Sequence, residues 1–493
     1  MFPAILLFTS QVNVICSVFL YNEVGPNIER TPTMTDTMIN SMAGFIPECN
    51  ISFNGGNLSS DSGAILPLDF ILSNSLLEPY SSLPFSDGRG SCSQRNSNFS
   101  LLAGQVFKYI LGYFTQADQT VLAQDPVLSR YFNGISSQSS VSRLFKRISS
   151  ETINAFWPVF MDQACQFVCA CQDDILIDAD STKTDTYGNQ EGSSWIHHYQ
   201  QTGYHPFVVN EYNTGALLGA WLRPGNAYSA DEAEAIMDEV LKRIPDRSAN
   251  GKMRQLRFRG DAAFYSGDLM TLFEERNNPV GYAIRAKGTG RLEGACQEAY
   301  ESSIHEEDFT YTASHPFYGE IRYQMTGSEK SRRVCFKLFF TEEEKAGSNG
   351  QIQLLLFPHI FAVITSLEDL SPEQVIAFYC QRGNSENFTK ELKDDFMANT
   401  LSHRSFEANA FEFFLKCLAY NLFHLFQFRV MEGADQNMTA GSFRKKYQKA
   451  ASRLSIHARR LYLKVASSFR YAQKFMHYLH KSRNVPWIPI LNC

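Results

Sequence analysis

Residues 377–396 read AFYCQRGNSENFTKELKDDF and place four chemically distinct side chains at spacings of three, four and seven residues: Tyr379, Arg382, Glu386 and Lys393. At about 100° per residue these side chains share one narrow stripe of a helix. A stripe that mixes two cations with a carboxylate does not suit a dry core. It indicates either a solvated, salt-bridged face or a phosphate site, where Arg supplies a bidentate fork, Lys a point charge, Tyr a hydroxyl or stacking ring and Glu a metal ligand.

Two predicted strands upstream each lead to an aspartate. The run DILID (174–178) leads to Asp180, and RQLRFRGD (254–261), in which apolar and basic residues alternate, ends at Asp261. Asp178 lies two residues before Asp180, so both would point to the same face of the strand, and either or both would face a site there. Carboxylates at strand ends suit hard divalent cations such as Mg²⁺. Taken alone, each aspartate is more typical of a turn or helix cap.

The order of the other predicted elements connects these features. Helical apolar spacing dominates up to about residue 170, and alternating strand patterns fill residues 288–370. Residues 371–374 then combine a capping box with Pro at the first helical position, which predicts a helix that runs to about Phe396. A β-rich block therefore lies between the second strand and the helix of Glu386, as an insertion would.

The pattern Tyr-x2-Arg-x3-Glu-x6-Lys, with both aspartates in order before it, resembles the signature of one branch of bacterial insertion-sequence DDE transposases. Four longer strings resemble insertion-sequence family thirteen-eighty, a group with transposase DDE domains: LIDADSTKTDTYGNQEGSSW (176–195), HHYQQTGYHPFVVNEYNTGALLGAWLRPGN (197–226), LRFRGDAAFYS (256–266) and YCQRGNSENFTKELK (379–393). The resemblance covers roughly Cys49 to Arg470.

This resemblance implies an α/β fold with an RNase H-like catalytic core and a β-rich insertion, flanked by a helical N-terminal and a basic C-terminal region. With it, the chain divides into six regions: a disordered or spurious extension (1–45), a mostly helical DNA-binding region (46–170), the first part of the core (171–287), the β-rich insertion (288–370), the core helices that carry the glutamate (371–435) and a basic helical tail (436–493).

The resemblance also assigns the catalytic residues. Asp180, Asp261 and Glu386 would be the catalytic metal ligands, holding two Mg²⁺ (or Mn²⁺) ions. Asp180 is preferred to Asp178 because the family's first aspartate precedes a Thr by two residues, matched here by Thr182. Two such ions would activate a water and then a 3′-hydroxyl, and stabilise the leaving oxygen of an in-line displacement. Strand cleavage and strand transfer would use the same site.

The expected partner is double-stranded DNA, both the terminal inverted repeats of a transposon and the target. Tyr379, Arg382 and Lys393 would hold phosphates at the transposon end. The resemblance further implies a homodimer on DNA, no small-molecule cofactor, and a place in the bacterial cytoplasm in association with the nucleoid. Two rivals remain: an RNase H-like nuclease that cuts without joining, and an inactive, transposase-derived DNA-binding protein.

Charge is distributed unevenly along the 493 residues. Residues 436–493 contain twelve Lys/Arg and no Asp/Glu, so this tail carries +12 and the rest −18, within a net charge of −6. This asymmetry favours backbone phosphates as partners of the tail, with a steep salt dependence. Its candidate DNA-binding residues are Arg444, Lys445, Lys446, Arg453, Arg459 and Arg460. The alternative is a solvated helical face.

Several other features point away from membranes and zinc. The first twenty residues are uncharged and fairly apolar. A secretory signal begins with a basic region, whereas the first basic residue here is Arg30, so the sequence favours a disordered or spurious extension over a signal peptide. The apolar run 411–428 contains Lys416 and fits a buried helix better than a membrane span. The cysteines form one cluster, residues 165–171, without the second cluster that a zinc site needs.

Aromatic and histidine residues follow the first strand. Trp195 and Tyr199 would stack on a displaced base or, as the plainer alternative, pack in the core or in a loop. His197 and His198 are adjacent, so on a strand they would face opposite ways, which disfavours a shared metal ion.

Overall fold

The computed structural model describes residues 54–89, 96–131, 136–197, 199–228, 232–303, 311–346 and 352–489; of residues 342–346 and 352–356 only the backbone is described. The chain forms two compact units, residues 1–56 and 57–493. The second unit contains the architecture given below. The extension predicted for residues 1–45 lies outside the described residues.

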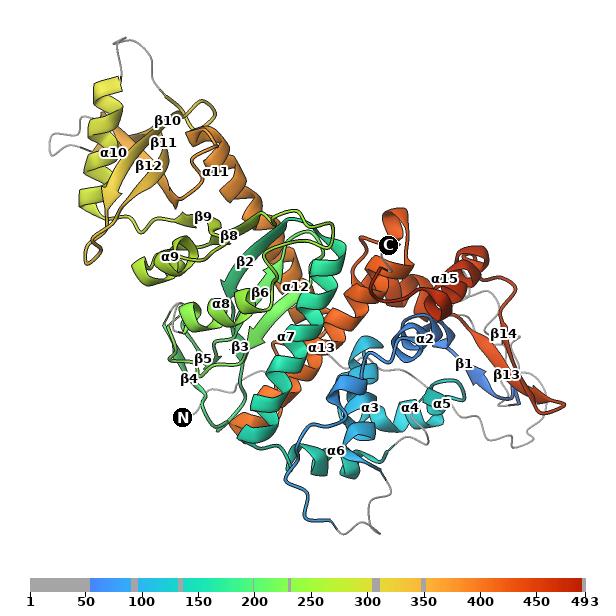
Figure 1. The fold of residues 1–493 in the computed structure, drawn as a ribbon. Helices are drawn as coiled ribbons and strands as arrows, with labels where there is room; N and C mark the ends of the chain where they lie inside the picture. The colour runs from blue at the N-terminus through green and yellow to red at the C-terminus, as the bar shows by residue number, and fades with distance from the viewer. Residues whose placement is uncertain are drawn as a thin grey trace, which may run out of the picture. The chain divides into compact units, whose positions relative to one another are not determined.

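An eight-stranded mixed sheet is the largest sheet of the second unit (Figure 1). Its strands in spatial order are β10 (Phe317–Gln324), β11 (Ser331–Ala346), β12 (Ile352–Thr365), β9 (Val280–Arg285), β8 (Leu256–Gly260), β2 (Ile175–Ser181), β6 (Phe207–Glu211) and β7 (Leu217–Trp221). β8 is parallel to both β2 and β9, and the other neighbours are antiparallel. The two strands predicted to lead to Asp180 and Asp261 are thus confirmed as β2 and β8, which are adjacent.

The parallel register of β2 and β8 decides where the aspartates lie. Asp178 is opposite Arg259, so two residues further along both strands Asp180 and Asp261 reach the same edge of the sheet. The opposite face of β2 presents apolar side chains to the core: Ile175, Ile177 and Ala179. This alternation, with a period of two, fixes the acidic face of the strand toward the site.

The block of residues 288–370 contains strands as expected, but it is neither all β nor a separate sheet. It opens with helix α10 (Gly290–Ser303), which buries Leu292 and Cys296, one turn apart, on one face. The sequence prediction missed this helix. Strands β10, β11 and β12 follow, and β12 pairs with β9, so the block extends the core sheet. Residues 311–313, which lie within the range expected to form strands, form none.

Helix α13 (Phe406–Val430) is buried on nearly all sides, as predicted for the apolar run 411–428. It packs against α7 (Ser150–Cys171), α3 (Asn98–Ile110) and β7 (Figure 1). Its Asn421 side chain bonds both the N–H and the carbonyl of Leu217, which ties the helix to the sheet. Within the described residues, no helix is long and apolar enough to cross a membrane.

The N-terminal part of the second unit is mostly helical. Its helices are α2 (Ile65–Ser73), α3, α4 (Asp118–Gln124), α5 (Leu128–Tyr131), α6 (Gln138–Phe145) and α7. α6 and α7 are separate helices, and α7 begins with a capping box at Ser149. The short strand β1 (Leu58–Ser59) pairs with a strand of the C-terminal tail, and α2 packs against its last helix.

The C-terminal tail corrects the prediction of a wholly helical segment. After α14 (Ala440–Phe443) and a short π-helix (Arg444–Gln448), an antiparallel hairpin forms from β13 (Ser452–His457) and β14 (Arg460–Val465), before helix α15 (Ala472–Asn484). Leu454 and Ile456, then Leu461 and Leu463, alternate with polar residues, which is a strand period. Ala458 and Arg459 have φ of 47° and 61°, as in the primed turns that close hairpins.

The remaining strands and α-helices are shorter elements. They are β3 (Thr184–Asp185), β4 (Ser194–Ile196) and β5 (Gln201–Tyr204), which form a small sheet, and the helices α8 (Ala233–Lys242), α9 (Gly267–Glu274), α11 (Pro372–Cys380) and α12 (Glu386–Asp394). Of these, β4 and α12 contribute residues to the cavity described below.

Candidate active site

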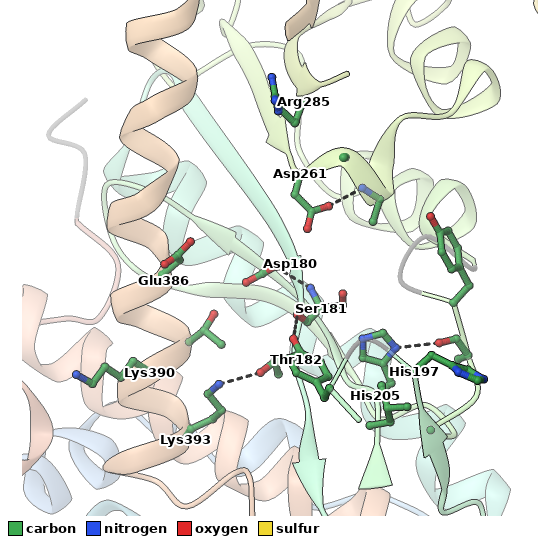
Figure 2. A pocket seen from close by; sticks show the side chains of 18 of the residues that line it. Asp180, Ser181, Thr182, His197, His205, Asp261, Arg285, Glu386, Lys390 and Lys393 are labelled. Atoms are coloured by element: carbon green, nitrogen blue, oxygen red, sulfur yellow. Dashed lines mark hydrogen bonds between the residues drawn. The ribbon is translucent and has the colours of Figure 1, made fainter. Parts of the chain in front are cut away.

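A cavity of about 1280 Å³ opens at the edge of the sheet where β2 and β8 end. Asp180, Asp261 and Glu386 all line it, although they are far apart in sequence. Figure 2 shows them on three elements: the end of β2, the turn after β8, and helix α12. The structure therefore brings together the three carboxylates that the sequence predicts.

The predicted helix of residues 371–396 is present with a change of winding in its middle. Ser371 forms the expected capping box, and Pro372 is in the first turn. Between α11 and α12, residues Gln381–Ser385 adopt a 3₁₀ turn, which winds at three residues per turn. The uniform 100° spacing therefore does not hold across the four predicted side chains.

Tyr379 is the one residue of the four that does not line the cavity. Its ring packs against Phe361, with 5.7 Å between ring centroids, and belongs to a small apolar cluster rather than to the cavity lining. Arg382, Glu386 and Lys393 do line the cavity. Lys393 donates to the Thr182 hydroxyl at 3.0 Å (Figure 2).

Asp180 interacts with a neighbouring guanidinium and with both other carboxylates. Burial raises its pKa above the ordinary value, the Arg382 guanidinium opposes that rise, and the carboxylates of Asp261 and Glu386 add to it. Arg382 Nη2 donates to Asp180 Oδ1 at 3.0 Å, and the same oxygen accepts from the Ser181 N–H. Asp261 and Glu386 are thus close enough to Asp180 for their charges to act on it.

Asp178 has a different environment from Asp180. Its side chain is 3% exposed and forms a two-pronged ion pair with Arg259, whose Nε and Nη2 donate at 2.7 Å each. Asp178 is thus fully engaged inside the protein, whereas Asp180 reaches the cavity. This difference supports Asp180 as the functional member of the pair.

The donor chemistry of the site fits a hard divalent cation. All three groups are carboxylates, the ligands that Mg²⁺ and Mn²⁺ prefer. Among the described residues, no three Asp, Glu, His or Cys side chains are already close enough together to hold a metal ion. The carboxylates are therefore suitable in kind and share a cavity, while Arg382 balances part of their charge.

Other cations line the cavity that the sequence analysis did not select. They are Arg285 and Lys287, which follow each other on alternate positions at the end of β9, and Lys390, one turn before Lys393. The alternation in GYAIRAK was a signal for the first two. Together these side chains give the acidic centre a basic surround, as a bound phosphodiester would need.

The wall opposite α12 carries aromatic and imidazole groups. Trp195 lines the cavity and is 47% exposed, so the core-packing alternative does not describe it. Tyr199 donates to the Ser181 carbonyl at 3.4 Å and its ring meets His205 edge-on. His197 lines the cavity, whereas His198 lies outside the described residues.

The candidate DNA-binding residues of the tail separate into two groups, and none of them lines the cavity. Lys445, Arg453, Arg459 and Arg460 are exposed. Lys446 is ion-paired with Asp435, which also accepts from Tyr447.

Arg444 is engaged within the protein. Its guanidinium donates to the carbonyls of Ile110, Tyr109 and Asp395 at 3.0, 3.1 and 2.7 Å. Burial lowers its pKa to about 10. Because its donors bind backbone carbonyls, Arg444 is structural here and we do not retain it as a DNA contact.

Comparison with known proteins identifies one matching family. The model of transposase DDE domain group 1 matches residues 43–487. No curated protein matches the chain. A solved structure of the piggyBac transposase synaptic complex with hairpin DNA is similar, with 10% identity over 79% of this chain and 80% of that chain and a TM-score of 0.43. The family match spans most of the chain.

Proposed function

Because this chain belongs to the family of transposase DDE domain group 1, we propose that it is a DNA transposase that cuts at the inverted-repeat ends of a transposon and joins them to target DNA. The observation that carries the proposal is the meeting of Asp180, Asp261 and Glu386 in one cavity with a basic surround. We further propose that its catalytic core is RNase H-like and that it belongs to insertion-sequence family thirteen-eighty. In that family its signature residues would be Tyr379, Arg382, Glu386 and Lys393.

In this proposal the three carboxylates hold two Mg²⁺ or Mn²⁺ ions. When bound, these ions supply an activated hydroxyl nucleophile and a stabilised leaving oxygen. The carboxylates must be ionised to bind them, and burial, which raises the pKa of Asp180, opposes that ionisation. The parallel register of β2 and β8 keeps Asp180 and Asp261 on one edge, and α12 brings Glu386 to them.

Cationic side chains hold the DNA. Arg382, next to Asp180, offers a planar fork to the scissile phosphodiester, because a guanidinium binds phosphate oxygens in pairs. Lys390 and Lys393 supply point charges on the same helix. Tyr379 acts from outside the cavity, by packing the helix against Phe361.

Away from the cavity, the exposed hairpin residues Arg453, Arg459 and Arg460, with Lys445, neutralise backbone phosphates. A homodimer that pairs two transposon ends and a location in the bacterial cytoplasm, at the nucleoid, complete the proposal. No small-molecule cofactor enters it.

The test is cleavage of labelled DNA that carries the element's own flanking ends, with Mg²⁺. Wild type is compared with Glu386→Gln and with Glu373→Gln, a matched control on the same helical segment that is exposed and outside the cavity. We expect wild type and the control to nick at the element boundary, and Glu386→Gln to bind without cutting.

Other outcomes distinguish the rivals. Cutting without any joined product would make the chain a nuclease. Binding by all three proteins, with no cutting under Mg²⁺ or Mn²⁺, would contradict the catalytic proposal and leave a DNA-binding relic.

A further inference from the structure

A buried ion pair lies directly beneath the candidate site. The side chain of Arg259 is 0% exposed and that of Asp178 is 3% exposed. The guanidinium engages both carboxylate oxygens, at 2.7 Å each. Because the two residues are opposite each other in parallel strands, the pair lies two residues before Asp180 on one strand and two before Asp261 on the other.

The same pair reaches the third catalytic element. The Ser385 hydroxyl donates to Asp178 Oδ2, and Ser385 immediately precedes Glu386. Arg259 Nη1 donates to the Phe378 carbonyl at the end of α11, at 3.0 Å. The helical segment is thus bonded to the strands on both sides of its 3₁₀ turn. Asp180 therefore follows Asp178 by two residues, Asp261 follows Arg259 by two, and Glu386 follows Ser385 by one. Each predicted metal ligand is thus next to a member of one buried network.

Aromatic rings confine the guanidinium as well. Its central carbon lies 4.5 Å from the ring centroid of Tyr212 and 5.2 Å from that of Phe378. Stacked rings and a fixed fork leave the side chain little freedom to move. Directional hydrogen bonds therefore help to set the distance between the strands and the helix.

Stability alone is a poor explanation for this arrangement. The cost of removing two charges from water can exceed their attraction, so apolar residues often serve as well in a core. Hydrogen-bonded ion pairs fix both the distance and the orientation of the groups that they join, whereas apolar contacts are not directional. Three elements that must each deliver one carboxylate to a common ion need that geometry.

We propose that Arg259, Asp178 and Ser385 form a positioning network that sets the spacing of Asp180, Asp261 and Glu386 and thereby the affinity of the site for divalent ions. This inference rests on the proposed function. The three residues touch neither DNA nor reacting groups and act through the carboxylates that follow them. Outer groups that orient metal ligands typically change metal affinity by about 10- to 100-fold when removed.

The test measures Mn²⁺ binding to the full chain by electron paramagnetic resonance, without DNA. Ser385→Ala removes one hydroxyl, and Arg259→Lys removes the fork while keeping the charge. Arg332→Lys is the matched control, because Arg332 is 4% exposed and ion-paired with Glu274 at 2.7 Å in another part of the sheet. We expect about ten-fold weaker Mn²⁺ binding for Ser385→Ala, a larger loss for Arg259→Lys, and no change for the control.

A conservative variant and the unfolding midpoints separate positioning from general destabilisation. Ser385→Thr keeps the hydroxyl and should bind Mn²⁺ about as wild type does. Ser385→Ala binding Mn²⁺ as tightly as wild type would overturn the inference even if Arg259→Lys fails to fold. Equal losses in Ser385→Ala and Arg332→Lys would overturn it too.

Failure of the proposed function has a different signature. Wild type that binds no Mn²⁺, or that binds it equally with and without Glu386→Gln, would remove the metal site itself and the network's role with it. Wild type that binds Mn²⁺ through Glu386, while Ser385→Ala binds equally well, would remove the network inference alone.

Discussion

Arg382 lies across the site from β2 and donates to Asp180 at 3.0 Å, with a second contact to the Ala179 carbonyl at 3.3 Å. Its side chain is 12% exposed and that of Asp180 29%. The pair therefore balances charge at the rim of the cavity rather than in the core. A guanidinium in this position is already desolvated and oriented where a phosphodiester would meet the carboxylates.

We expect Arg382→Lys to lower the rate of strand cleavage by about 100-fold, with little change in DNA affinity. A lysine keeps the charge but loses the planar fork that stabilises developing charge on a phosphate. Single-turnover cleavage and a DNA-binding titration measure the two quantities. The control variant is Arg322→Lys, because Arg322 is exposed and forms an ion pair with Glu368. Equal cleavage by Arg382→Lys and wild type would contradict this role.

The raised pKa of Asp180 predicts a pH-dependent stability. The folded protein binds this proton more tightly than the unfolded chain, so ionisation of Asp180 costs stability. This loss of stability is absent below the pKa of Asp180 in the unfolded chain and fully present above its raised pKa in the folded protein. Asp180→Asn should therefore become more stable relative to wild type as pH rises through this window, without metal. Urea unfolding at a series of pH values measures it. A relative stability that falls as pH rises would contradict the prediction.

The hairpin predicts a change in the salt dependence of DNA binding. Replacing Arg453, Arg459 and Arg460 together with Gln should reduce the slope of log K against log salt by about 2.7, at about 0.9 per phosphate contact. A control triple replaces Lys242, Arg322 and Lys330, exposed cations already paired with carboxylates. The same slope for the hairpin variant and wild type would exclude the hairpin from the DNA interface.

Arg444 predicts the opposite result. Arg444→Ala removes the donor to three backbone carbonyls, and leaving such groups unsatisfied costs about 1–3 kcal/mol each. The free energy of unfolding should fall by at least about 2 kcal/mol, while the salt slope stays as in wild type. Denaturant unfolding and the binding series above measure both. A stable variant with a reduced slope would return Arg444 to the DNA interface.

The sequence predicted those elements whose formation depends mainly on residues close together in the chain. The apolar run before Asp180 and the alternation before Asp261 are strand signals, and both strands are present. The capping box at Ser371 starts its helix where expected. The choice of Asp180 over Asp178 came from resemblance, and the ion pair of Asp178 with Arg259 gives it a physical reason, since one carboxylate is engaged and the other reaches the cavity.

Non-local contacts account for what the sequence did not predict. FRKKYQK resembles an exposed basic run, and the burial of Arg444 depends on carbonyls of α3 more than 300 residues away. The 3₁₀ turn that interrupts the predicted helix begins three residues after Phe378, whose carbonyl accepts from Arg259, and ends at Ser385, which donates to Asp178. The hairpin was predictable from the period-two alternation around Arg459, which the helical interpretation overlooked.

The most direct test of the central claim maps the metal site on the polypeptide itself. Fe²⁺ is substituted for Mg²⁺, and ascorbate with peroxide then cleaves the backbone next to the bound ion. We predict cuts near Asp180, Asp261 and Glu386 in the same molecules, suppressed by excess Mg²⁺ and lost in Glu386→Gln. A protein that cuts DNA with Mg²⁺ but shows Fe²⁺ cleavage at none of these three segments would contradict a metal site built from these carboxylates.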